Sequence, residues 1–213
     1  MALKTLDQKI LLFDWSGTVS NDIAPVYESN CRLLEQHGMP RPSLEDWRNG
    51  SSWNASSVLS AEFGFKTGYL YRRFGEILDD VLAHSDPAQM YPGAKELFTR
   101  LFALGKHVEI ISSHPQSNLE SEIATYGLGG LVRQSMGNVN DKTPVISAAF
   151  SRMGAEASNV AYIGDTVQDI RAAKQAGVFA VGVTYGYHSR ELLAAEAPDV
   201  LADSLKELAD MIR

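Results

Sequence analysis

The apolar residues of this chain fall into short runs separated by stretches of helical spacing. The first run, Ile10–Phe13, lies between Lys9 and Asp14 and contains no polar position. That pattern is typical of a strand buried on both faces of a parallel sheet. Similar runs follow at 107–112, 160–163 and 178–183, with weaker strand signals at 131–134 and 199–201 and helical spacing at 94–104, 118–126, 143–153 and up to 176. This alternation predicts βαβ units, a parallel sheet and an α/β fold class.

Residues 20–86 interrupt the alternation. Apolar residues recur there at helical spacing without a strand-like run, and the first helical stretch ends in the helix-stopping sequence His37-Gly38-Met39-Pro40. We therefore expect a small helical domain over 20–86, inserted after the first strand. Residues 1–19 and 87–213 would form the α/β core domain.

Polar residues follow the predicted strands and gather at one rim of the sheet, because the carboxyl ends of parallel strands meet at the same edge. They are Asp14 and Ser16, Ser112 and Ser113, Lys142, and Asp165 with Asp169. The Ser16-Gly17-Thr18 turn after the first strand would also place backbone N–H groups around an anion.

Each rim residue has a structural interpretation when it is considered alone. The paired serines are good helix caps, the lysine could be a surface residue, and acids suit the positive end of a helix. Taken together, however, three carboxylates, a hydroxyl and a lysine match what Mg²⁺ and a phosphoryl group require. Asp14 is then placed to attack phosphorus as a nucleophile.

Composition narrows the partners. The net charge of -7 and the pI near 5.2 argue against nucleic acid and anionic membranes, and no apolar run approaches the length of a membrane span. Cys31 is the only cysteine, which excludes an internal disulfide and favours a reducing compartment. We expect a cytoplasmic monomer or homodimer that acts on a small phosphorylated or phosphonate substrate.

Four segments resemble the motifs of the haloacid dehalogenase (HAD) superfamily, and more closely its phosphatase-like branch with a helical cap after the first strand. They are Phe13-Asp14-Trp15-Ser16-Gly17-Thr18, Ile110-Ile111-Ser112-Ser113, Lys142-Thr143-Pro144, and Gly164-Asp165 through Asp169. The resemblance implies a Rossmann-like core, Mg²⁺ as cofactor and an aspartyl-phosphate on Asp14. It further implies that Asp14, Asp165, Asp169 and the backbone carbonyl of Ser16 bind the metal, with catalytic roles for Ser112 and Lys142.

The chain departs from this family pattern at position 16. The phosphatases carry a second aspartate there, which serves as general acid for the leaving group and general base for water, a contribution of roughly 10²–10⁴-fold. A serine hydroxyl is no base near neutral pH. We therefore expect slow hydrolysis of the aspartyl-phosphate unless another group supplies a base, and His114, next to the second motif, is one such group.

Three alternatives stay open. Phosphonoacetaldehyde hydrolases share the Asp-Trp-x-Gly-Thr pattern but use a cap lysine, where this chain aligns Trp53; Lys66 lies in a different context. Haloacid dehalogenases need no metal, which the intact pair of Asp165 and Asp169 argues against. A HAD fold that retains the site for phosphate binding or regulation is the third, and Ser16 is its main support.

The predicted cap would set substrate choice, because it covers the rim where the phosphoryl group sits. The candidate substrate contacts there are Arg48, Asn49 and Trp53, with Asn54 beside them. On the core side the candidates are Gly17, Thr18 and Ser113. Trp47 is expected to pack inside the cap.

Overall fold

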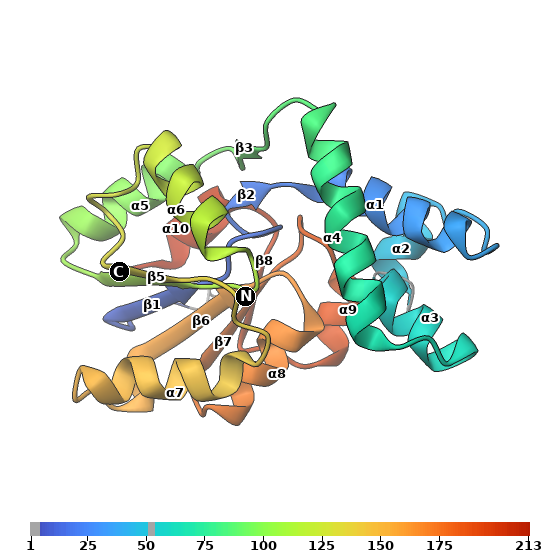
Figure 1. The fold of residues 1–213 in the computed structure, drawn as a ribbon. Helices are drawn as coiled ribbons and strands as arrows, with labels where there is room; N and C mark the ends of the chain where they lie inside the picture. Colours follow the sequence, from blue (N-terminus) through green and yellow to red (C-terminus); the bar gives the residue numbers. More distant parts are fainter. Residues whose placement is uncertain (1–4, 51–53) are drawn as a thin grey trace.

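The computed structural model describes residues 5–50 and 54–213. Figure 1 shows a sheet covered by helices on both faces, with a group of helices beside one end of the sheet. The elements, in chain order, are β1 (Ile10–Phe13), β2 (Ser20–Asn21), α1 (Ile23–Gln36), α2 (Leu44–Asn49), α3 (Ala55–Phe63), α4 (Thr67–Ala83), β3 (Gln89–Met90), α5 (Ala94–Ala103), β4 (His107–Ile111), α6 (Gln116–Thr125), β5 (Gln134–Met136), α7 (Lys142–Arg152), a 3₁₀ turn (Ala157–Asn159), β6 (Val160–Gly164), α8 (Val167–Gln175), β7 (Phe179–Val183), α9 (Arg190–Ala195), β8 (Val200–Ala202) and α10 (Leu205–Met211).

The main sheet has six parallel strands in the order β5-β4-β1-β6-β7-β8. β1 lies inside the sheet, where Ile10 pairs with His107 of β4 on one side and Val160 of β6 on the other. All four residues of β1 are buried, which explains its uninterrupted apolar run. The predicted α/β fold with a parallel sheet is therefore confirmed.

Two apolar clusters hold helices on opposite faces of the sheet. Leu11 and Phe13 of β1 point to the cluster that includes α5, α6 and α10, while Ile10 and Leu12 point to the cluster that includes α7, α8 and α9. Successive side chains of a strand alternate between faces, so a four-residue run supplies both layers. The result is a three-layer arrangement of helix, sheet and helix.

The helices α1, α3 and α4 pack around a cluster of their own, formed by buried residues such as Leu33, Leu59 and Leu70. The chain leaves the main sheet and returns to it through β2 and β3, which pair antiparallel (Ser20 with Met90, Asn21 with Gln89). The division into a core domain and a cap over 20–86 stays a prediction. In the described ranges, none of the helices has the length and apolar character needed to cross a bilayer.

The structure differs from the sequence analysis in four short elements. β5 begins at Gln134, so the strand expected over 131–134 lies a few residues later in the chain. The helix α9 and the β2–β3 pair were not anticipated, because six-residue and two-residue elements are too short to show a periodic pattern.

Trp47 is fully buried and packs edge-on against both Tyr27 of α1 and Tyr187 of the β7–α9 segment.

Candidate active site

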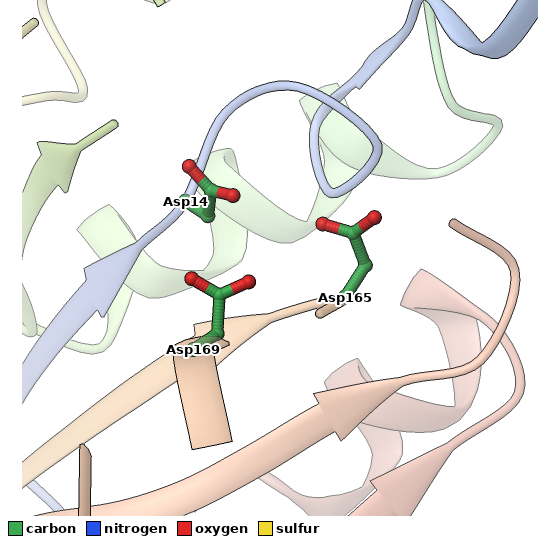
Figure 2. A group of neighbouring side chains, drawn as sticks. All are labelled: Asp14, Asp165 and Asp169. Carbon is green, nitrogen blue, oxygen red and sulfur yellow. The ribbon is translucent and has the colours of Figure 1, made fainter. Parts of the chain in front are cut away.

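Three aspartates meet at the carboxyl ends of β1 and β6. Asp14 follows β1, Asp165 follows β6, and Asp169 lies in the first turn of α8. The three side chains lie next to one another in Figure 2, and one oxygen of each lies within 4.8 Å of the others. Because β1 and β6 are neighbours, the backbone N–H of Asp14 donates to the carbonyl of Ile163 at 2.8 Å, which fixes the spacing of the first two.

Hydrogen bonds orient two of these carboxylates. Asp165 accepts from the Thr18 hydroxyl at 2.8 Å and from the backbone N–H of Tyr187 at 2.7 Å. Asp169 accepts from the N–H and the hydroxyl of Thr166, at 2.9 and 2.6 Å, in a capping box that starts α8. Asp165 and Asp169 therefore both hold the local backbone in place. The helix cap uses only Oδ2 of Asp169 and leaves Oδ1 for other contacts.

Lys142, the first residue of α7, forms ion pairs with two of the three carboxylates. Its Nζ lies 3.0 Å from Oδ2 of Asp14 and 2.6 Å from Oδ1 of Asp169. Burial lowers the pKa of this lysine, but the two carboxylates raise it well above its usual value. The ammonium therefore stays charged and offsets part of the negative charge of the cluster.

Asp14 is the least satisfied of the three. Its Oδ1 is buried without a hydrogen-bond partner among the described residues. Burial raises the pKa of Asp14 to about 6, against the lowering effect of Lys142 and the Ser112 hydroxyl. A catalytic role or a bound cation would explain why this buried oxygen has no partner among the described residues.

Three glycines give the carboxylates room. A Cβ on Gly17 or Gly186 would lie 2.2 Å from Oδ2 of Asp165, and one on Gly164 would lie 2.4 Å from Cγ of Asp169. Gly17 also has φ +73°, a conformation that favours glycine. The backbone is thus folded closely around the acid cluster.

The geometry agrees with comparisons to known proteins. The family model described as "Haloacid dehalogenase-like hydrolase" matches residues 11–183. The chain belongs to the haloacid dehalogenase-like hydrolase family. The phosphoglycolate phosphatase of Synechococcus elongatus is 27% identical over 207 residues, covering 95% of this chain and 96% of the relative. That of Vibrio parahaemolyticus is 26% identical over 220 residues, covering 97% and 96%.

Solved structures show the same fold. A haloacid dehalogenase-like family hydrolase from Streptococcus pneumoniae superposes with a TM-score of 0.77 at 17% identity, covering 99% of both chains. The predicted membership of the HAD superfamily is confirmed.

The HAD motif residues come together as the sequence analysis expected. Asp14, Lys142, Asp165 and Asp169 form the cluster described above, and Ser112 is fully buried next to Asp14. Within the described residues, no hydrogen bond reaches the backbone carbonyl of Ser16, the oxygen expected to bind metal.

The predicted substrate contacts are more dispersed. The N–H of Gly17 donates to Ser20 and Asp22, and that of Thr18 donates to Trp15, so these two residues shape the loop with their own donors. Ser113 is exposed.

On the cap side, Arg48 and Asn49 line a cleft of about 520 Å³ between α2 and the segment 184–191. One guanidinium nitrogen of Arg48 donates to the carbonyl of Thr184 at 2.9 Å, while its Nε is buried without a partner among the described residues. Trp53 lies outside the described residues.

Two polar residues near Ser16 were missed by the sequence analysis. Asp22 is buried and accepts from the Gly17 N–H at 3.0 Å and the Tyr187 hydroxyl at 2.7 Å. Glu122 of α6 accepts from the Trp15 indole N–H at 2.6 Å and lies 3.1 Å from Nε2 of His114. Both are ordinary surface-type residues in the sequence, and only the fold places them at this loop.

The charge state of His114 reflects this neighbour. Burial lowers its pKa, but the hydrogen bond and charge of Glu122 raise the net pKa above the usual histidine value. Burial also raises the pKa of Glu122, and the hydrogen bonds from His114 and Trp15 bring it below its usual value. The hydrogen bond from His114 to Glu122 therefore favours the charged form of the imidazole more than water does.

Proposed function

We propose that this chain is a Mg²⁺-dependent phosphatase that hydrolyses a small phosphorylated metabolite through an aspartyl-phosphate on Asp14. The observation that carries the proposal is the buried Oδ1 of Asp14, which has no hydrogen-bond partner in the part of the chain that the structure describes, while Lys142 and two further carboxylates lie beside Asp14. The names of the relatives make 2-phosphoglycolate the first substrate to test. The cytoplasmic location stays a prediction.

The donor set fits a hard divalent cation. Among the described residues, three carboxylates share a single ammonium, which leaves excess negative charge, and one buried oxygen has no partner. Asp14, Asp165, Asp169 and the Ser16 carbonyl would hold Mg²⁺. The ion would neutralise the cluster and the phosphoryl oxygens of the substrate.

The chain's own residues account for the first chemical step. Oδ1 of Asp14 forms a bond to phosphorus as the bond to the leaving oxygen breaks, and the leaving group takes the electron pair. Lys142 keeps Asp14 oriented through Oδ2 and adds positive charge beside the phosphoryl group. The buried Ser112 hydroxyl, close to Asp14, is a donor for a phosphoryl oxygen.

Arg48, a substrate contact expected from the sequence, would bind the rest of the substrate. A guanidinium whose buried Nε has no partner among the described residues suits an anionic leaving group, such as the carboxylate of a phosphorylated hydroxy acid. Arg48→Gln should then raise KM for 2-phosphoglycolate and leave that for p-nitrophenyl phosphate nearly unchanged.

The proposal is tested with p-nitrophenyl phosphate and Mg²⁺, comparing wild type, Asp14→Asn and Ser16→Asp, with Asp210→Asn as a control that removes an exposed carboxylate. We expect a burst followed by slow release in the wild type, faster release in Ser16→Asp, and no product from Asp14→Asn. Intact-mass spectrometry should show one beryllofluoride adduct on wild type and none on Asp14→Asn.

If wild type and Ser16→Asp are both as inert as Asp14→Asn, and no adduct forms, the phosphatase proposal is wrong. A role in phosphate binding would then be the better explanation of the retained cluster. A matched assay with a phosphonate substrate tests the C–P bond alternative; Lys66, the lysine available in the predicted cap, is exposed.

A further inference from the structure

Three side chains in successive contact connect the loop after Asp14 to α6. Oγ of Ser16 lies 3.1 Å from Nδ1 of His114, and Nε2 of His114 lies 3.1 Å from Oε1 of Glu122. The second oxygen of Glu122 is held by the indole N–H of Trp15, the residue before Ser16. The first side chain of the row, Ser16, belongs to the loop after Asp14, and the last, Glu122, is hydrogen-bonded to the same loop through Trp15.

The partners define the proton positions. Ionised Glu122 can only accept hydrogen bonds, so the His114 nitrogen that faces it carries a hydrogen. In the neutral ring Nδ1 then has a free lone pair, which accepts the hydroxyl hydrogen of Ser16. When the ring is charged, the same nitrogen donates to Ser16 instead.

We infer that Ser16, His114 and Glu122 form a proton relay that takes over the work of the acid/base aspartate that this chain lacks. The inference rests on the proposed function. Ser16, two residues after Asp14, is assigned to contact the reacting water, while His114 acts through it and Glu122 is a positioning residue.

The relay accounts for each proton that moves when water hydrolyses the aspartyl-phosphate. The water oxygen forms a bond to phosphorus, its proton passes to Oγ of Ser16, and the hydroxyl proton of Ser16 passes to Nδ1 of His114. The bond between phosphorus and Asp14 breaks, and Asp14 recovers its carboxylate as inorganic phosphate leaves. The ring, now charged, can return its proton by the same path to the leaving group of the next substrate.

Two other interpretations of Ser16 fit the contacts less well. As a nucleophile it would need nearby N–H donors for an oxyanion, but the N–H groups of Gly17 and Thr18 already bond within the loop. Asp22 is also close to the Ser16 hydroxyl: burial raises the pKa of that carboxyl, and the hydroxyls of Tyr187 and Ser16 oppose part of the rise. Its Oδ1, however, already accepts two hydrogen bonds, whereas Nδ1 of His114 has no described partner besides Ser16.

A purely structural role for His114 is the main competitor. The Trp15–Glu122 bond already ties the loop to α6, and Trp15 also stacks on Tyr126 at 5.7 Å. The imidazole is therefore not needed to hold the loop. Its side chain is 15% exposed, so it is largely shielded from solvent without being sealed in the core.

The test measures the two half-reactions separately with p-nitrophenyl phosphate and Mg²⁺ in rapid-quench and stopped-flow experiments. Nitrophenolate leaves without protonation, so phosphorylation of Asp14 does not need the relay, whereas hydrolysis of the phosphoenzyme does. His114→Gln should keep the burst amplitude and slow phosphoenzyme hydrolysis about 10²-fold. Ser16→Ala should do the same, and the double variant should be no slower than either single one.

Rescue separates proton transfer from structure. Ser16→Asp supplies a carboxylate directly, so adding His114→Gln to it should change hydrolysis by no more than about threefold. Glu122→Gln, which leaves the histidine in place, should slow hydrolysis less than His114→Gln does. His107→Gln and Glu120→Gln are matched controls, since His107 pairs with Glu109 at the far end of β4 and Glu120 is exposed on α6; both should behave as wild type.

The relay is refuted if His114→Gln hydrolyses its phosphoenzyme as fast as wild type. It is equally refuted if His114→Gln slows the Ser16→Asp protein as much as it slows wild type, because that result shows a structural role. Absence of nitrophenolate release from wild type and Ser16→Asp alike identifies failure of the proposed function itself, and the relay falls with it.

Discussion

The metal-free acid cluster should destabilise the protein, and Asp14→Asn should therefore stabilise it. Burial raises the pKa of Asp14 from 3.8 to about 6 in spite of the Lys142 ion pair. A shift of about two units corresponds to about 3 kcal/mol, which the folded protein loses when Asp14 ionises. Asparagine has the same shape without the charge, so the variant should be more stable by up to about 3 kcal/mol at pH 7.5.

The pH dependence gives the sign of the effect. The folded protein holds the Asp14 proton more tightly than the unfolded chain, so it binds more protons between pH 3.8 and about 6. Wild-type stability from this group falls as pH rises through that window and is constant above it. The gap between variant and wild type should thus be about half as large at pH 5 as at pH 7.5.

The assay is thermal and urea unfolding in EDTA at pH 5, 6 and 7.5, repeated with excess Mg²⁺. A gap of about 3 kcal/mol should appear as a Tm difference of roughly 6–12 °C in a chain of this size. Mg²⁺ at about 100 times its Kd should add about 2.7 kcal/mol to the wild type and less to the variant. An Asp14→Asn protein no more stable than wild type at pH 7.5 in EDTA, or a gap independent of pH, would refute this reasoning. Asp210→Asn should show no gap.

Three further changes probe the same region. Lys142→Met removes the ammonium shared by two buried carboxylates and should cost the metal-free protein about 3–5 kcal/mol in urea unfolding, with partial recovery in Mg²⁺; an equal loss with and without Mg²⁺ would contradict this. Gly186→Ala places a Cβ 2.2 Å from Oδ2 of Asp165 and should weaken Mg²⁺ binding in calorimetry by about tenfold or more, so unchanged affinity would mean that Asp165 is no ligand. Tyr187→Phe deprives buried Asp22 of a donor and should lower stability by about 1–2 kcal/mol, whereas an unaffected Tm would show that the bond contributes little.

The core of the fold could be predicted because its signals are local. The run Ile10–Phe13 is apolar at every position since β1 lies inside the sheet, and the acids at the ends of β1 and β6 follow their strands directly. Because β1 and β6 are neighbouring parallel strands, the residues that follow them, Asp14 and Asp165, lie close together. β5 was placed a few residues early, because only three of its residues pair with β4 and their side chains are polar or partly exposed.

The surroundings of Ser16 could not be predicted in this way. His114 was noted for its position after the second motif, but Glu122 lies eight residues later, within α6, and its approach depends on which face α6 turns to the loop. Asp22 depends similarly on Tyr187, whose segment returns to the site from β7. Contacts that join three separate loops have no period or spacing in the sequence.

The short β2–β3 ladder has a consequence for protein engineering. Because Ser20 faces Met90 and Asn21 faces Gln89, the chain enters and leaves the α1–α4 segment at adjacent points. A two-residue Asn-Gly connection between Asn21 and Gln89 would close these strands as an ordinary hairpin. The same two points are where a helical segment from another family member could be grafted while the sheet and its aspartates are retained.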